Sequence, residues 1–197
     1  MLQFITHPND RYNIVEQVKM VLEGGCRWIQ LHMNESTNEE VKSIAEELIP
    51  LCKELDAILV IEDNIELVKE LEIPGVHLTT KHTPAAEARN LLEGGPIIGV
   101  TVNTVGDILA LKGIDVDYVG INLPNSKEEL GNYHKIIKEI RDAGIELPIV
   151  AIGDITVEDI DKIMLIGVNG IATSNAIINA ENPIEYTKAM LEKLYLK

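Results

Sequence analysis

Cysteine is scarce in this chain of 197 residues, and no long hydrophobic run occurs in it. Its two cysteines, Cys26 and Cys52, lack the paired spacing of metal ligands and fall within apolar segments, so we expect two buried thiols. A membrane span needs about 20 consecutive apolar residues, and no segment approaches that length. Because the start of the chain also lacks the basic residues and apolar run of a signal peptide, we expect a cytoplasmic protein.

Positive charge is also in short supply. The chain has 17 Lys and Arg residues against 32 Asp and Glu residues, which gives a net charge of −15. This balance argues against nucleic acid and against an anionic membrane as partners, because both would be repelled. Anionic metabolites are disfavoured at long range for the same reason. A small phosphorylated ligand would therefore need helix N-termini, a metal ion or a few well-placed cations.

Several catalytic signatures are missing as well: no Ser–His–Asp order, zinc-ligand spacing or Gly-x-Gly-x-x-Gly element stands out. What the chain has instead is a regular alternation of short hydrophobic strands and amphipathic helices. We predict strands at residues 2–6, 27–31, 57–61, 75–78, 97–101, 117–121, 148–152 and 169–172. We predict helices near residues 11–23, 38–54, 64–71, 84–93, 104–111, 132–143, 156–165 and 182–194.

Eight such strand–helix units favour one architecture. Several of the strands are near-continuous apolar runs, which is typical of parallel strands covered on both faces. Glycines after several helices mark the usual helix stops. An open, doubly wound sheet seldom needs eight units. We therefore predict an α/β protein with a single (β/α)8 TIM-barrel domain over residues 1–197.

In such a barrel, phosphate is commonly held by the loops after strands seven and eight. The seventh predicted strand ends at Gly153 and Asp154, and the eighth ends at Thr173, Ser174 and Asn175. A buried strand that enters a helix through small residues points free backbone N–H groups into one space. We therefore predict that these five residues bind the phosphate of a substrate.

Polar side chains also follow the second and third predicted strands. Gln30, His32 and Asn34 alternate along the end of the second strand and so share one side, which would be the barrel mouth. Glu62 and Asp63 end the third strand, and adjacent carboxylates there suit a Mg²⁺ ion that bridges to substrate phosphates. The alternative is that Asp63 caps the helix that follows.

Further candidates belong to the fourth, fifth and sixth strands. His77 lies by parity on a packed face, so we expect a buried histidine with satisfied hydrogen bonds. Thr101 ends the fifth strand and is expected at the barrel mouth. Lys127, beyond the sixth strand, is either a mobile cation for a diphosphate or an ordinary surface lysine.

Taken in order and spacing, six segments of the chain resemble thiamine phosphate synthase (thiamine-phosphate pyrophosphorylase) and its sister group, the thiazole tautomerases. The segments are residues 24–31 (GGCRWIQL), 61–67 (IEDNIEL), 74–78 (PGVHL), 98–104 (IGVTVNT), 117–120 (DYVG) and 148–155 (PIVAIGDI). The resemblance implies a barrel enzyme that joins a pyrimidine diphosphate to a thiazole phosphate with Mg²⁺. In that reaction the diphosphate leaves, and the thiazole nitrogen captures a pyrimidine-methyl cation. A homodimer is also implied.

The resemblance assigns roles to individual residues of this chain. The diphosphate and the catalytic steps would fall to Gln30, His32, Asn34, Thr101 and Lys127. The acidic pair on the third strand would hold Mg²⁺, and it falls on Glu62 and Asp63. The nest for the thiazole phosphate falls on Asp154, Ser174 and Asn175.

The chain departs from the family pattern at several of these positions. His32 stands where the family has arginine and Asn34 where it has lysine, which removes two permanent cations. Asp154 takes the place of a glycine, and His82 stands where a second Mg²⁺ carboxylate is expected. Asn103 replaces the histidine of the tautomerases, which disfavours that activity.

Two hypotheses about function therefore stay open. In the first, the chain is an active synthase whose lost cations are replaced by His32, Lys81 and Lys127. In the second, it is a family member that binds a phosphorylated or thiamine-related ligand, or a partner protein, without catalysis. An unrelated sugar-phosphate isomerase or aldolase ranks last, because we find neither a Schiff-base lysine inside a strand nor a carboxylate pair across the barrel.

Overall fold

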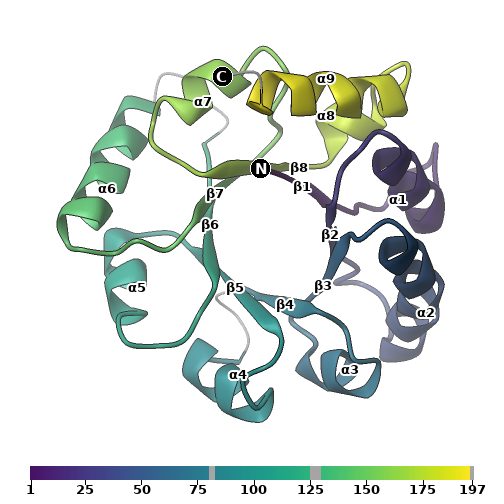
Figure 1. The fold of residues 1–197 in the computed structure, drawn as a ribbon, viewed down its shortest axis with the longest axis horizontal. Coiled ribbons are helices and arrows are strands. Elements are labelled where there is room, and N and C mark those ends of the chain that lie inside the picture. Colours follow the sequence, from purple (N-terminus) through teal and green to yellow (C-terminus); the bar gives the residue numbers. More distant parts are fainter. Residues whose placement is uncertain (80–82, 125–129, 196–197) are drawn as a thin grey trace.

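The eight strands close into a parallel barrel in which each strand pairs with its neighbours in sequence and β1 pairs with β8 (Figure 1). The structure, a computed structural model, describes residues 1–79, 83–124 and 130–195. The strands are β1 (Leu2–Ile5), β2 (Trp28–Leu31), β3 (Ile58–Glu62), β4 (Gly75–Leu78), β5 (Ile97–Val102), β6 (Tyr118–Asn122), β7 (Ile149–Ile152) and β8 (Gly170–Thr173). The predicted TIM barrel is confirmed, with each strand within a residue or two of its expected bounds.

Helices surround the barrel on its outer side (Figure 1). They are α1 (Ile14–Glu23), α2 (Asn38–Glu54), α3 (Ile65–Glu70), α4 (Ala85–Leu91), α5 (Val105–Ala110), α6 (Leu130–Asp142), α7 (Ile160–Met164), α8 (Asn175–Ile178) and α9 (Pro183–Tyr195). The last helix, α9, contacts α1, α7, α8 and β1, so it covers the junction where the first and last strands meet. None of the helices in the described residues is long and apolar enough to cross a membrane.

Two helices begin later than predicted, because polar side chains form turns before them. Asn9 Oδ1 accepts hydrogen bonds from the backbone N–H groups of Arg11 and Tyr12, which forms a turn ahead of α1. The helix then begins after Asn13, whose side chain caps the first turn. Similarly, the hydroxyl of Thr156 donates to Asp159 at 2.8 Å, so residues 156–159 form a turn and α7 begins at Ile160.

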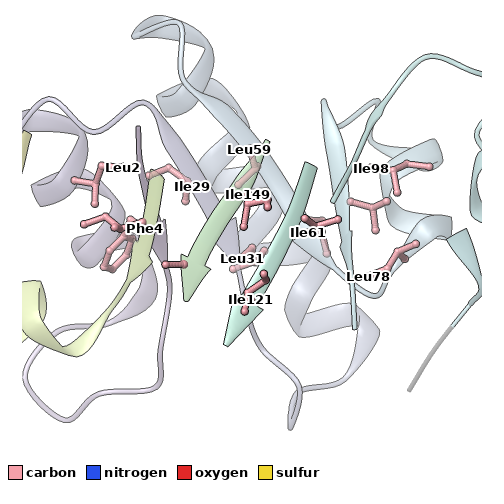
Figure 2. Close-up of a cluster of buried hydrophobic side chains, with 14 of the residues drawn as sticks. Leu2, Phe4, Ile29, Leu31, Leu59, Ile61, Leu78, Ile98, Ile121 and Ile149 are labelled. Carbon is pink, nitrogen blue, oxygen red and sulfur yellow. The ribbon is translucent and has the colours of Figure 1, made fainter. Parts of the chain in front are cut away.

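The main hydrophobic core lies between the outer face of the barrel and the helices. Its side chains alternate along the strands, as a period of two requires. Figure 2 shows members from seven strands: Leu2, Phe4, Ile29, Leu31, Leu59, Ile61, Leu78, Ile98, Ile121 and Ile149. Cys26 and Cys52 belong to this core as free, buried thiols, which confirms that prediction, and burial raises the pKa of each thiol to about 11.

The inner face of the barrel carries a second, smaller apolar cluster around Tyr118 and Trp28, whose rings meet edge to face at 4.7 Å. Tyr118 fits there because its neighbour on β5 is Gly99: a Cβ at that position would lie 2.0 Å from the Tyr118 Cζ atom. Gly120 likewise leaves room for Ile152. Apolar and polar side chains therefore share the barrel interior, and Tyr118 belongs to both groups, because its ring packs on Trp28 and its hydroxyl accepts from Gln3.

Candidate functional site

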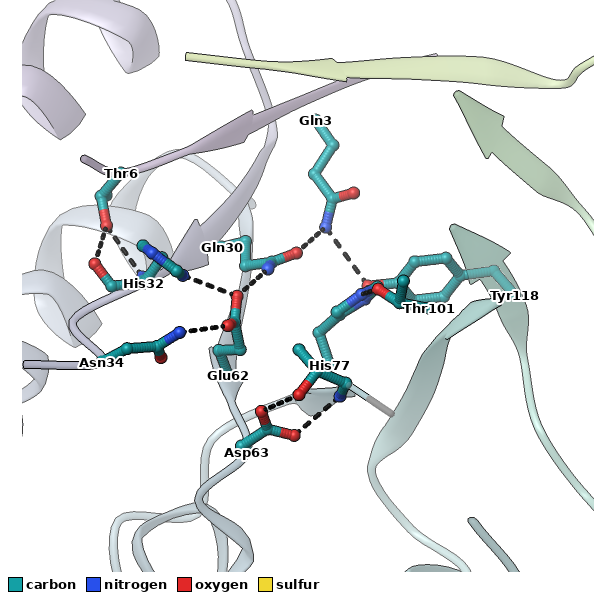
Figure 3. A network of polar contacts seen from close by, with 11 residues as sticks. Gln3, Thr6, Gln30, His32, Asn34, Glu62, Asp63, His77, Thr101 and Tyr118 are labelled. Carbon is teal, nitrogen blue, oxygen red and sulfur yellow. Dashed lines mark hydrogen bonds and ion pairs between the residues drawn. The ribbon is translucent and has the colours of Figure 1, made fainter. Parts of the chain in front are cut away.

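Polar side chains from six consecutive strands point into the barrel and contact one another (Figure 3). We call them the lumen cluster. Each occupies an inward-facing position of its strand, between outward-facing core residues. The members, from β1 to β6, are Gln3, Gln30, Glu62, His77, Thr101 and Tyr118.

Glu62 is the charged centre of one half of this cluster. Its Oε2 atom accepts from Gln30 Nε2 at 2.7 Å and lies 2.9 Å from His32 Nδ1, while its Oε1 atom accepts from Asn34 Nδ2 at 3.0 Å. Burial alone would raise the pKa of the Glu62 carboxyl. The hydrogen bond and charge of His32, together with Asn34 and Gln30, hold that pKa below its ordinary value. Gln30, His32 and Asn34 therefore do meet, as their spacing predicts, and they meet on a carboxylate.

His32 is held in place from two sides. The Thr6 hydroxyl accepts from the backbone N–H of His32 at 2.9 Å and lies 3.3 Å from its carbonyl oxygen. The hydrogen bond to Glu62 raises the pKa of His32, although partial burial opposes this effect. Glu62 therefore favours the protonated form of His32, and in that form the two side chains make an ion pair.

His77 is buried and bonded through both ring nitrogens, as expected. Its Nδ1 atom lies 2.8 Å from the Tyr118 hydroxyl and its Nε2 atom 2.7 Å from Thr101 Oγ1. Burial lowers the pKa of His77 to about 4, against the attraction of the Glu62 charge. The ring is therefore neutral at neutral pH, and it supports Thr101 from below the barrel mouth.

The two carboxylates of β3 do not share one site. Glu62 points into the lumen, whereas Asp63 accepts from the backbone N–H of Thr79 at 2.7 Å and from its hydroxyl at 2.6 Å (Figure 3). The helix after β3 is capped by Asn64, whose side chain accepts from Leu67 N, rather than by Asp63. Among the described residues, no group of three or more His, Cys, Asp or Glu side chains could hold a metal ion.

A cavity of about 190 Å³ opens at the ends of β1, β2, β7 and β8. Its wall includes His32, Gly153, Asp154 and Ser174. The Ser174 Oγ atom is buried and, within the part of the chain that the structure describes, has no hydrogen-bond partner. Thr173 contributes to the wall, but its hydroxyl lies beside the backbone of the turn after β7, 3.3 Å from Ile155 N.

The other predicted site residues lie around this cavity or outside the described chain. Asn175 is exposed and lines the cavity at the start of α8, and Asp154 is exposed at its edge. Lys127, together with Lys81 and His82, falls outside the described residues.

Sequence reasoning overlooked four residues of the site: Gln3, Thr6, Thr79 and Tyr118. An inward position could have been read for Gln3 from the alternation of β1, where apolar residues flank it on both sides. Tyr118 gave no such signal, because an aromatic residue in a strand is usually core. The contacts of Thr6 and Thr79 join one loop to another and leave no local pattern.

Comparisons with known proteins agree with this architecture. A family model described as thiamine monophosphate synthase matches residues 2–177. The chain belongs to this family. A thiamine-phosphate synthase of Bacteroides fragilis is 46% identical to it over 199 residues, covering 96% of this chain and 98% of the relative. One from Bacteroides thetaiotaomicron is 47% identical, covering 96% and 95%.

A solved structure of the same family supports the fold at the level of backbone geometry. The thiamine phosphate pyrophosphorylase from Pyrococcus furiosus matches with a TM-score of 0.86 and 26% sequence identity, covering 98% of this chain and 94% of that one. The family resemblance predicted from the six sequence segments is therefore confirmed. The chain therefore keeps the family's fold along its length.

Proposed function

We propose that this chain is a transferase that joins a hydroxymethylpyrimidine diphosphate to a thiazole phosphate. The bond between the pyrimidine methylene carbon and the diphosphate oxygen breaks, and pyrophosphate leaves with the electron pair. The thiazole nitrogen then donates its lone pair to the methylene carbon and forms the new C–N bond. What supports this proposal is membership of the family, together with a cavity at the strand ends that borders the polar lumen cluster at His32.

The observation that carries the proposal is the cavity at the ends of β7 and β8. The Ser174 Oγ atom is buried there without a partner, and a buried hydroxyl left unpaired carries an energetic penalty unless a ligand satisfies it. Gly153 stands opposite on the β7 side and adds no side chain to the cavity wall, while its backbone N–H donates to the Ala172 carbonyl oxygen at 3.1 Å. We assign the thiazole phosphate to this cavity, where the unpaired Ser174 hydroxyl can donate to a phosphate oxygen.

The pyrimidine diphosphate then lies above the lumen cluster. His32 borders both places, because it lines the cavity and also bonds to Glu62 inside the barrel. Glu62 raises the pKa of His32 and so favours the charged form of the ring, which can donate a hydrogen bond to the reacting phosphates. Thr101 reaches the same space from β5, and Lys127 remains our candidate for a further cation. Catalysis in this scheme is electrostatic: the residues bind the two substrates in line and stabilise the departing diphosphate.

We propose that Asp63 is the carboxylate of the β3 pair that would bind Mg²⁺. Glu62 fits a cation poorly, because its side chain is about 6% exposed and is already paired with the His32 ring at 2.9 Å. Asp63 also accepts hydrogen bonds at both oxygens, from Thr79, but it is a partly exposed carboxylate at a strand end. Mg²⁺ is typically bound by one or two such carboxylates plus substrate phosphates. When bound, the ion would neutralise charge on the diphosphate.

The proposal also covers the cellular location and the oligomeric state of the protein. We place the reaction in the cytoplasm, where free thiols such as Cys26 and Cys52 are stable. We also propose a homodimer, in keeping with the family resemblance.

The test measures product formation from the two substrates in the presence of Mg²⁺, and the released pyrophosphate is the readout. We expect Ser174→Ala to raise the KM for the thiazole phosphate, and Asp63→Asn to lower kcat and weaken the response to Mg²⁺. Ser43→Ala, an exposed serine on α2, is the matched control and should change neither. If the wild-type protein forms no product while calorimetry still detects binding of the thiazole phosphate, the chain is a binding protein and the proposal is wrong.

A further inference from the structure

A continuous series of hydrogen bonds crosses the barrel lumen from β3 to β5 (Figure 3). It begins at Glu62, whose Oε2 atom accepts from Gln30 Nε2 at 2.7 Å. Gln30 Oε1 in turn accepts from Gln3 Nε2 at 3.1 Å, and the same Gln3 nitrogen donates to the Tyr118 hydroxyl at 3.2 Å. The series therefore passes from one side of the barrel to the other through two amide groups and a phenol.

The second half of the series leads to the barrel mouth. The Tyr118 hydroxyl lies 2.8 Å from His77 Nδ1, and His77 Nε2 lies 2.7 Å from Thr101 Oγ1. Tyr118 and His77 are both about 1% exposed, whereas Thr101 is partly exposed. Five buried or half-buried groups thus end on one hydroxyl that reaches the space we assign to substrate.

The carboxylate at the start fixes the direction of the first bonds. A carboxylate only accepts, so Gln30 must turn its NH₂ group toward Glu62 and its carbonyl oxygen toward Gln3. Gln3 must then turn its own NH₂ group toward Gln30. The Gln3 carbonyl oxygen is buried without a partner among the described residues, so no competing bond there turns this amide around.

The direction of these bonds determines which nitrogen of His77 carries hydrogen. Gln3 donates to the Tyr118 oxygen, so the Tyr118 hydrogen is left to donate to His77 Nδ1. A neutral imidazole that accepts at Nδ1 carries its hydrogen on Nε2. His77 Nε2–H therefore donates to Thr101 Oγ1, and the hydrogen of the Thr101 hydroxyl must point away from His77.

We propose that Glu62, acting through the four side chains between, holds the Thr101 hydroxyl as a hydrogen-bond donor toward the substrate. This inference rests on the proposed function, in which Thr101 borders the departing diphosphate. A donor there stabilises the negative charge that develops on the leaving oxygen, whereas a lone pair would repel it. Glu62, Gln3 and Tyr118 are then positioning residues, because they act on the substrate only through Thr101.

The first test observes the tautomer of His77 directly and needs no turnover. The protein is labelled with ¹⁵N in its five histidines, and the His77 signals are identified by their loss in His77→Gln. We expect the Nε2–H form in the wild-type protein at pH 7.5. The Nδ1–H form, or an even mixture, would overturn the proposal.

Two matched variants separate this effect from the loss of any buried amide. Gln3→Met removes both donors of Gln3, so Tyr118 can accept from His77 and the Nδ1–H form becomes populated. Gln17→Met removes an equally buried glutamine that bonds to the backbone of His7 and Tyr12, outside the series, and should leave the His77 tautomer unchanged. Should Gln3→Met fail to fold, Gln30→Met releases the Gln3 amide and serves the same purpose.

The second test is a double-mutant cycle on the rate. Thr101→Val removes the hydroxyl itself. Because the positioning residues act only through this hydroxyl, no variant of them should lower kcat more than Thr101→Val does. Gln3→Met should lower kcat about fivefold to tenfold, as expected for one misdirected hydrogen bond, with KM little changed. The double variant should be no slower than Thr101→Val, whereas losses that multiply would refute the coupling. A wild-type protein without turnover would contradict the proposed function, while the tautomer result would still decide this inference.

Discussion

The buried histidine of the lumen cluster makes the stability of this protein sensitive to acid. His77 is about 1% exposed, and burial lowers its pKa to about 4, compared with an ordinary value of 6.5 in the unfolded chain. Between these two values the unfolded state binds a proton that the folded state excludes. The contribution of neutral His77 to the free energy of unfolding is therefore complete above pH 6.5 and is lost as the pH falls toward 4.

The size of the effect follows from the gap between the two pKa values. Each pH unit within the window costs about 1.4 kcal/mol, so His77 lowers the free energy of unfolding by about 2 kcal/mol at pH 5 relative to pH 7.5. The loss approaches about 3 kcal/mol near pH 4, where the folded protein begins to accept the proton. These values are a large fraction of the total stability of an ordinary domain.

Urea unfolding at pH 7.5 and pH 5 measures this loss in the wild-type protein and in His77→Gln. Glutamine can still bond to Tyr118 and Thr101 but cannot be protonated, so the variant should lose about 2 kcal/mol less than the wild type over this interval. His134→Gln, on an exposed histidine of α6, should follow the wild type. An equal loss in the wild type and in His77→Gln would show that His77 is protonated in the folded state, and would refute the reasoning.

Three further predictions concern packing, capping and charge. Gly99→Ala would place a Cβ 2.0 Å from the Tyr118 ring and should destabilise the barrel by about 3 kcal/mol or more in urea unfolding, whereas Gly95→Ala, with nothing within 4 Å, should not. Asn13→Ala removes the cap of α1 and should cost about 1 kcal/mol in the same assay; an unchanged midpoint would contradict the capping role. Asp154→Asn should tighten thiazole phosphate binding severalfold in calorimetry, and a gain that persists in high salt would not be electrostatic.

The barrel could be predicted because its strands are buried on both sides or nearly so. Segments such as residues 58–61 are apolar throughout, and each is separated from the next strand by one amphipathic helix. Helix starts were harder to predict. We predict a helix from residue 11, yet Asn13 has the extended backbone of a helix cap (ψ 167°), and Asn9 holds Arg11 and Tyr12 in a separate turn before it.

Only part of the site could be predicted. The alternation of residues along a strand shows which side chains point into the barrel, but not how far along the barrel axis each one lies. Gln30, His32 and Asn34 were expected on one side, and they do converge on Glu62. What the pattern could not show is that a tyrosine of β6 would meet Gln3 of β1 across the lumen. That contact depends on the tilt and stagger of the strands, which no local segment encodes.

His32 and His77 respond to acid in opposite directions, and this determines how the pH experiments must be designed. The pKa of His32 is raised by Glu62, so its stabilising effect is complete below pH 6.5 and is lost as the pH rises through the folded value. The Glu62 partner, with a lowered pKa, contributes above pH 4.5. Between pH 7.5 and 5 the wild-type protein therefore gains stability at one histidine while it loses stability at the other. A flat pH profile of the wild type alone is compatible with both effects, and only the comparison of single variants separates them.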